Sequence, residues 1–147
     1  MSYFARVRPI QLLIIEDNPG DVRLLEEAFD ELKANVAIHV ARDGAEGIEQ
    51  VAGAARNQED WQPDLILLDL NLPKISGHEV LAKIKSNPQT RHIPVIILTS
   101  SRAESDVRRA YQSYANAYLR KPSTLEGLLN TARDVKNFWM ETATLPS

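Results

Sequence analysis

The chain has 147 residues, 44% of them hydrophobic and 25% charged, which suits one compact domain with a buried core. Its formal net charge of -3 comes from 20 acidic and 17 basic side chains spread along the whole length, so we expect no nucleic-acid partner. The absence of cysteine excludes disulfides, thiolate metal sites and thiol nucleophiles. The N-terminus lacks the apolar stretch of a signal peptide, and no run approaches the roughly 20 apolar residues of a membrane span. We therefore expect a cytoplasmic protein that does not contact the membrane.

Five segments have the length and the Leu, Ile or Val content of strands. In chain order they are IQLLII (10–15), VAIHV (36–40), LILLD (65–69), VIILTS (95–100) and the shorter AYLR (117–120). Three of them are nearly unbroken apolar runs, which is typical of strands covered on both faces.

Helical patterns lie between these strands. Asn18 can cap a helix that has Pro19 at its first position. Four more helix starts are indicated by a capping residue followed three places later by glutamate, at Asp43/Glu46, Ser76/Glu79, Ser101/Glu104 and Ser123/Glu126. The last helix has an apolar stripe that runs to about residue 140, and ARNQEDWQP (55–63) is typical of an extended loop. This fivefold β-α alternation predicts an α/β fold with a doubly wound parallel sheet.

Polar residues follow the predicted strands at one edge of that sheet. Glu16 and Asp17 follow the first strand, Asp69 closes the third, Thr99 closes the fourth and Lys121 follows the fifth. The carboxyl ends of parallel strands meet at one edge, where ligands bind. Crowded carboxylates need a cation, and oxygen ligands without Cys or clustered His favour Mg²⁺. Lys121 adds a positive charge and Thr99 a hydroxyl donor, which leaves Asp69 as the nucleophile of a phosphoryl transfer.

Each of these residues has an ordinary structural explanation when taken alone. An Asp after a strand is usually a turn or cap residue, a strand-end Thr is usually satisfied by backbone, and a lone Lys is usually a surface charge. The functional interpretation depends on all of them occurring together at the ends of four strands.

Four blocks of the sequence resemble the receiver domain of bacterial two-component response regulators: IIEDNPGD (14–21), LILLDLNLPKISG (65–77), PVIILTS (94–100) and YLRKP (118–122). The resemblance covers about residues 10–135, with residues 136–147 as a C-terminal extension of a single domain. It implies a flavodoxin-like (βα)5 fold with strand order 2-1-3-4-5. It also implies that the protein accepts a phosphoryl group from a histidine kinase and catalyses its own dephosphorylation, without turnover of a separate substrate.

The resemblance also assigns roles to residues of this chain. Asp69 is the phosphoacceptor, Glu16 and Asp17 are the acidic pair that binds Mg²⁺ together with Asp69, and Asn71 offers its backbone carbonyl to the metal. Thr99 and Tyr118 are the switch pair, and Lys121 contacts the phosphoryl group. Lys121-Pro122 is a position where receivers often have a cis peptide bond. Asn71 and Ser101 stand where hydrolysis is tuned in this family.

The tail KNFWMETATLPS (136–147) and the loop before the third strand are similar to stand-alone receivers that partner bacterial and cyanobacterial phytochrome kinases. This resemblance implies a symmetric homodimer, with Tyr111, Tyr114, Phe138 and Trp139 on the dimer face. Alternatively, Phe138 and Trp139 complete the apolar stripe of the last helix. Because the chain ends at residue 147, we expect its output to pass through protein contacts.

Two functions other than that of a phosphorylated receiver are alternatives for this sequence. A pseudo-receiver would be a binding module independent of phosphorylation, but none of the acidic, Asp or Lys positions is lost. An aspartate-dependent phosphohydrolase of the haloacid dehalogenase type would need a second aspartate two places after the first, where this chain has Asn71.

Overall fold

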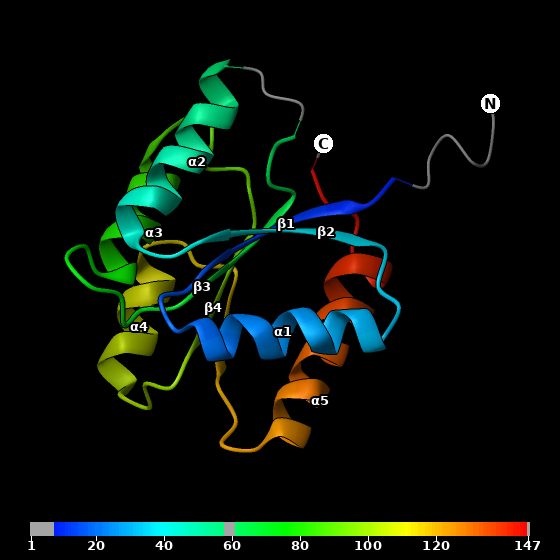
Figure 1. Cartoon of the computed structure of the whole chain (residues 1–147). Coiled ribbons are helices and arrows are strands. Elements are labelled where there is room, and N and C mark those ends of the chain that lie inside the picture. Colours follow the sequence, from blue (N-terminus) through cyan, green and yellow to red (C-terminus); the bar gives the residue numbers. More distant parts are fainter. Residues whose placement is uncertain (1–7, 58–60, 147) are drawn as a thin grey trace.

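The five predicted strands form one parallel sheet. The computed structural model describes residues 8–57 and 61–146. Its strands are β1 (Ile10–Ile15), β2 (Val36–Ala41), β3 (Leu65–Leu68), β4 (Val95–Thr99) and β5 (Ala117–Arg120), in the order β2-β1-β3-β4-β5 (Figure 1). All four neighbouring pairs are parallel. The predicted flavodoxin-like topology is confirmed.

The helices cover both faces of this sheet. They are α1 (Pro19–Glu31), α2 (Gly44–Asn57), α3 (Gly77–Ser86), α4 (Glu104–Gln112) and α5 (Leu125–Val135). Figure 1 shows α1 and α5 on one side of the sheet and α2, α3 and α4 on the other, and the buried side chains form two matching clusters. Among residues 8–57 and 61–146, no helix is long and apolar enough to cross a membrane.

The apolar runs lie where both faces are covered. Every residue of β3 and β4 is buried, whereas the edge strands β2 and β5 are mostly half-buried. Helices exclude water from both faces of the central strands, so polar side chains on these strands would lack hydrogen-bond partners. This burial holds the ends of β1, β3 and β4 rigidly, which fixes the positions of the polar residues that follow them.

Three helix starts agree with the sequence and two do not. The side chains of Asn18, Asp43 and Ser76 accept hydrogen bonds from backbone N–H groups in the first turns of α1, α2 and α3. Helix α4 begins after Ala103, whose methyl side chain cannot make a cap bond. The hydroxyl of Ser101, the predicted cap, donates instead to Asp106. Thr124, one place after the predicted Ser123, caps α5.

The last helix and the long loop also differ from the prediction. Helix α5 ends at Val135, and the chain continues as a π-helix over Lys136–Thr142 in place of a regular helix to about 140. Helix α2 runs to Asn57, so the predicted loop over 55–63 begins later, and its residues 58–60 lie outside the described part of the chain.

Candidate functional site

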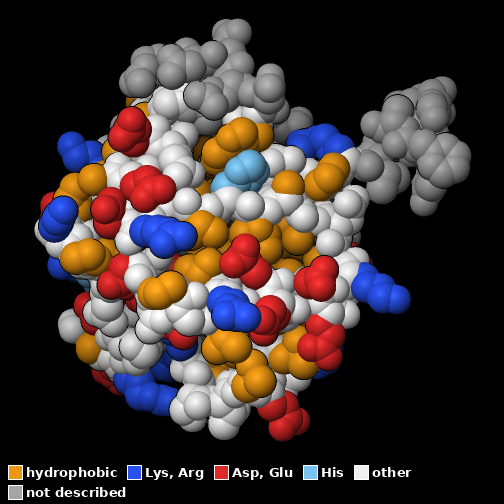
Figure 2. Space-filling view, in the orientation of Figure 1, with side chains coloured by type: hydrophobic (Ala, Val, Ile, Leu, Met, Phe, Trp, Pro, Cys, Tyr) orange, Lys and Arg blue, Asp and Glu red, His pale blue; other side chains and the backbone are white. Residues whose placement is uncertain are grey.

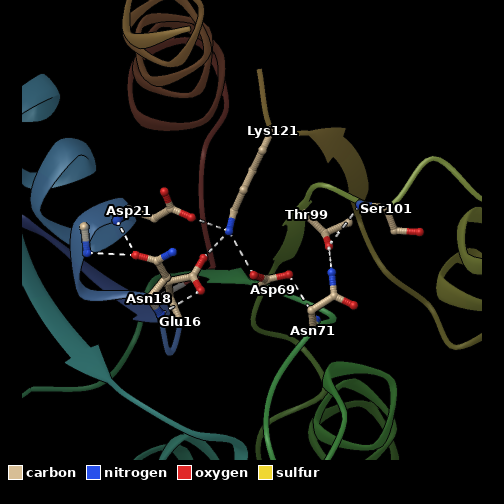
Figure 3. Close-up of polar contacts among 9 residues, drawn as sticks. Glu16, Asn18, Asp21, Asp69, Asn71, Thr99, Ser101 and Lys121 are labelled. Atoms are coloured by element: carbon tan, nitrogen blue, oxygen red, sulfur yellow. Dashed lines mark hydrogen bonds and ion pairs between the residues drawn. The ribbon is translucent and has the colours of Figure 1, made fainter. Parts of the chain in front are cut away.

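The strand ends bring the predicted site residues together. Asp69 donates its backbone N–H to the Ile15 carbonyl at 3.1 Å, and the Lys121 N–H bonds the Thr99 carbonyl at 2.8 Å. These bonds extend the sheet by one residue beyond β3 and β5, so the side chains of Asp69 and Lys121 project from rigid backbone on either side of the end of β4. Figure 3 shows them converging with Glu16.

The carboxylates form an oxygen cluster suited to a divalent cation. One oxygen from each of Glu16, Asp17 and Asp69 lies within 4.8 Å of the others. Glu16 and Asp69 are buried and Asp17 is exposed. Burial, together with the nearby Asp69 charge, raises the pKa of Glu16 to about 7, although Lys121 acts in the opposite direction. Three ionised carboxylates in a partly buried site repel one another, so a bound cation would stabilise them. Mg²⁺ is a hard cation that prefers oxygen ligands, and it fits the oxygens of Glu16, Asp17 and Asp69.

Lys121 forms ion pairs with two carboxylates of this cluster and with Asp21 outside it. Its Nζ bonds Glu16 Oε1, Asp21 Oδ2 at 2.8 Å and Asp69 Oδ2 at 2.9 Å (Figure 3). Burial alone would lower the pKa of Lys121, but hydrogen bonds to the three carboxylates raise it above its ordinary value. Sequence reasoning missed Asp21 as a site residue. It stands in the IIEDNPGD block, four residues after Asp17, but nothing local to that block indicates a lysine 100 residues away.

Asp69 is held as an ionised carboxylate. Its Oδ1 accepts the backbone N–H of Asn71 at 3.0 Å, and its Oδ2 accepts from Lys121. Burial by itself would raise the pKa of Asp69, but these hydrogen bonds lower it below the ordinary value. A charged carboxylate with fixed orientation can act as a nucleophile.

Thr99 lies beside Asn71. Its side chain is fully buried, and its Oγ1 accepts from Asn71 Nδ2 at 3.4 Å and from the Ser101 N–H at 3.5 Å. Tyr118 is half-buried and donates its hydroxyl to the Ser101 carbonyl at 3.1 Å. The switch role of Thr99 and Tyr118 and the metal-binding carbonyl of Asn71 remain predictions.

The expected cis bond between Lys121 and Pro122 is absent. All peptide bonds in the described ranges are trans. The trans form of an X–Pro bond is intrinsically favoured by about 0.5 to 1 kcal/mol. Lys121 reaches its three carboxylates with the trans bond.

A second polar network, which the sequence did not indicate, lies behind Thr99. The Ser101 hydroxyl donates to Asp106 Oδ2 at 2.5 Å, and His78 Nε2 lies 3.0 Å from Asp106 Oδ1. It joins the loop after β4 to the first turns of α3 and α4. Ser101 therefore contacts the backbone or side chains of Thr99, Tyr118 and Asp106.

The aromatic residues assigned to a dimer face fall into two groups. Tyr111 is 49% exposed and Tyr114 75% exposed, at the end of α4. Phe138 is 54% exposed, whereas Trp139 packs against the cluster of α1 and α5. In Figure 1, α4 and the Lys136–Thr142 π-helix lie on opposite sides of the view, so these residues do not form one patch.

The chain resembles known proteins in sequence and in fold. Residues 12–133 match the response regulator receiver domain family. The chain is 39% identical to the response regulator Rcp1 of Synechocystis sp., over 95% of each chain. It superposes on the phosphorylated cyanobacterial phytochrome response regulator RcpA with a TM-score of 0.88, at 39% identity over 95% of this chain and 99% of that one.

A structure of Rcp1 with bound Mn²⁺ gives a TM-score of 0.87, at 39% identity over 95% of this chain and all of that one. Receiver domains bind Mg²⁺ at an acidic site, and the cluster of Glu16, Asp17 and Asp69 supplies suitable ligands here. On these grounds the chain belongs to the response regulator receiver family.

Proposed function

We propose that this protein accepts a phosphoryl group on Asp69 from the phosphohistidine of a sensor histidine kinase. The observation that carries the proposal is that the Asp69 carboxylate shares the acidic cluster with Glu16 and Asp17 and also bonds the Lys121 ammonium. A nucleophile flanked by cation sites can approach a phosphoryl group that carries its own negative charge.

The chain's residues divide the reaction between them. An Asp69 oxygen forms the new bond to phosphorus as the bond to the histidine nitrogen breaks, and the electron pair of that bond leaves with the imidazole. Lys121 pairs with an oxygen of the transferred group, and Thr99 donates its hydroxyl to another. Mg²⁺ bound by Glu16, Asp17, Asp69 and the Asn71 carbonyl supplies charge neutralisation. Water later hydrolyses the acyl phosphate and restores Asp69.

The transferred group adds about -1.5 to -2 charges at the sheet edge. Lys121 and Thr99 are drawn toward it, and Ser101, whose N–H bonds Thr99 and whose carbonyl bonds Tyr118, moves with them. The start of α4 is thereby altered, which is a change that a partner protein can read.

A phytochrome-type kinase is the proposed donor. Support comes from RcpA and Rcp1, whose 39% identity extends over 95% of this chain. We further propose that the protein is cytoplasmic, forms a homodimer and signals through protein contacts without binding nucleic acid.

Helix α1 presents an acidic surface to which the donor kinase can dock. It contains five acidic residues and one basic residue, and Figure 2 shows acidic side chains over the region where α1 lies. Asp21 of this helix contacts Lys121 directly. A kinase that docks beside the site is expected to present lysine or arginine there.

The test is phosphorylation by acetyl phosphate with Mg²⁺, followed by intact mass spectrometry. Wild type should gain about 80 Da, the mass expected for one acyl phosphate on a carboxylate. EDTA and Asp69→Asn should each abolish the gain, whereas Asp30→Asn, an exposed aspartate of α1, should leave it unchanged. Labelling of Asp69→Asn would move the phosphoacceptor to another residue.

The donor class is tested separately. Phosphotransfer from a phosphorylated phytochrome kinase should be faster than transfer from an unrelated histidine kinase under the same conditions. Equal rates would contradict the phytochrome assignment while leaving the receiver assignment in place.

A further inference from the structure

The three acceptors of the Lys121 ammonium differ in what else they do. An ammonium has three hydrogens, and Glu16, Asp21 and Asp69 together use all of them. Glu16 and Asp69 also belong to the oxygen cluster that fits a divalent cation, and Asp21 does not. Asp21 is therefore the acceptor of Lys121 that a bound cation would leave free.

A divalent cation and the ammonium compete for the same oxygens. Both are positive, so bringing the cation to Glu16 and Asp69 repels Lys121 and takes away two of its three acceptors. Without another acceptor, Lys121 would lose its hydrogen bonds in a site where its side chain is only 13% exposed. Such a loss would oppose cation binding.

Asp21 is placed to prevent that loss. Its side chain is 33% exposed, compared with 4% for Glu16 and 6% for Asp69, so it is the best hydrated of the three carboxylates. Figure 3 shows Asp21 and Asp69 on different sides of the Lys121 nitrogen. The ammonium can give up Asp69 and Glu16 while it keeps Asp21.

The backbone position of Asp21 does not depend on Lys121. Asn18 Oδ1 accepts the N–H groups of Gly20 and Asp21 at 2.9 and 3.2 Å, which fixes the first turn of α1. A carboxylate in the first turn of a helix is also favoured by the helix dipole. The sequence from Asn18 to Asp21 therefore fixes the backbone from which this carboxylate reaches the site.

We propose that Asp21 is a positioning residue that retains the Lys121 ammonium at the rim of the site while a divalent cation occupies Glu16, Asp17 and Asp69. Cation binding then does not expel Lys121. Lys121 then stays within reach of the incoming phosphoryl group. This benefit to phosphoryl transfer rests on the proposed function. The effect of Asp21 on cation binding does not rest on it.

The experiment is a double-mutant cycle that uses Mn²⁺ as the probe, with free Mn²⁺ measured by electron paramagnetic resonance. Wild type, Asp21→Asn, Lys121→Met and the double variant are compared, and urea unfolding checks that each is folded. Asp21→Asn should weaken Mn²⁺ binding about fivefold or more when Lys121 is present and less than about twofold in the Lys121→Met background. Equal weakening in both backgrounds would overturn the proposal, because Asp21 would then act only as a nearby charge.

Two further variants sharpen the result. Glu26 lines a cavity of about 280 Å³ together with Glu16 and Asp17, and no contact with Lys121 is found in the described structure. Glu26→Gln removes one negative charge near the site and should change Mn²⁺ affinity less than about twofold. Asp21→Glu keeps the charge and should recover most of the affinity lost in Asp21→Asn. A loss in Glu26→Gln as large as that in Asp21→Asn would also contradict the proposal.

The cycle is independent of phosphorylation. If wild type binds Mn²⁺ with the expected coupling but acetyl phosphate does not label it, the proposed function fails and the role of Asp21 stands. If labelling succeeds and the cycle is additive, the role of Asp21 fails and the proposed function stands.

Discussion

His78 Nε2 lies 3.0 Å from Asp106 Oδ1, and this contact joins the first turn of α3 to the first turn of α4. His78 is 7% exposed. The hydrogen bonds from Ser101 and His78 lower the pKa of Asp106, so its carboxylate can only accept. His78 Nε2 is therefore the donor of this hydrogen bond, and His78 Nδ1 has no hydrogen-bond partner in the described structure.

Asp106→Ala should destabilise the protein by about 1 to 3 kcal/mol. The change leaves the buried His78 donor and the Ser101 hydroxyl without their acceptor, and an unsatisfied buried donor has a cost of this size. The free energy of unfolding is measured in urea. Ser105→Ala, at the neighbouring exposed position of α4, should stay within about 0.5 kcal/mol of wild type. Equal stability of the two variants would show that the His78 contact contributes nothing.

Gly77→Ala should destabilise the protein by about 1 to 3 kcal/mol and reduce labelling of Asp69. A Cβ at Gly77 would lie 2.2 Å from the Asp69 carbonyl oxygen and 2.5 Å from the Leu70 Cα, so the backbone that carries Asp69 must shift. Urea unfolding and labelling by acetyl phosphate are the two measurements.

Gly53→Ala is the matched control within α2. An added Cβ there meets nothing within 4 Å, so the variant should gain about 0.5 to 1 kcal/mol from helix propensity and keep wild-type labelling. A wild-type result for Gly77→Ala would mean that α3 can move away from the Asp69 backbone without effect on the site.

Glu16 should make the metal-free protein less stable as the pH rises from about 4.5 to 7. Its pKa is raised to about 7 in the folded state from an ordinary value of 4.5. Within this window the folded protein holds a proton that the unfolded chain has released, so unfolding releases a proton and stability falls with rising pH.

The decisive comparison is the pH dependence of urea unfolding, in EDTA, for wild type and Glu16→Gln. Glu16→Gln cannot titrate, so its stability should decline less across this window. Parallel curves for the two proteins would contradict the raised pKa. Adding Mg²⁺ to wild type at pH 7 should restore stability, because a ligand that binds only the folded state stabilises it.

Self-association should depend on the exposed aromatic residues at the end of α4. Tyr114 has a φ of 70°, a left-handed conformation that Asn adopts more readily than Tyr. Tyr114→Asn therefore removes an exposed apolar surface without straining the backbone. Sedimentation velocity should show a shift from dimer toward monomer.

Phe138→Ser tests the second exposed group, in the C-terminal π-helix. Trp139 is unsuitable because it packs against the core, and its replacement would change folding as well as association. If both Tyr114→Asn and Phe138→Ser leave the sedimenting mass of a dimer unchanged, the association face lies elsewhere.

The elements of the fold could be read from the sequence because each signal is local. The apolar runs of β3 and β4 indicated burial on both faces, and Asn18 with Pro19 indicated the start of α1. The predicted start of α4 was wrong by two residues and that of α5 by one. Ser101 and Ser123 have the right chemistry for a cap, but the Ser101 hydroxyl bonds Asp106 and Thr124 fits the cap position better.

The strand pattern and the residues at the strand ends follow from local sequence, because hydrophobic period and turn chemistry act over a few residues. The contact of Lys121 with Asp21 and that of His78 with Asp106 arise only in the folded chain, because these residues are 100 and 28 positions apart. Such contacts depend on how α1 and α3 are rotated and shifted against the sheet, which follows from the packing of the whole core. The pairing of Lys121 with Asp21 is set by that packing.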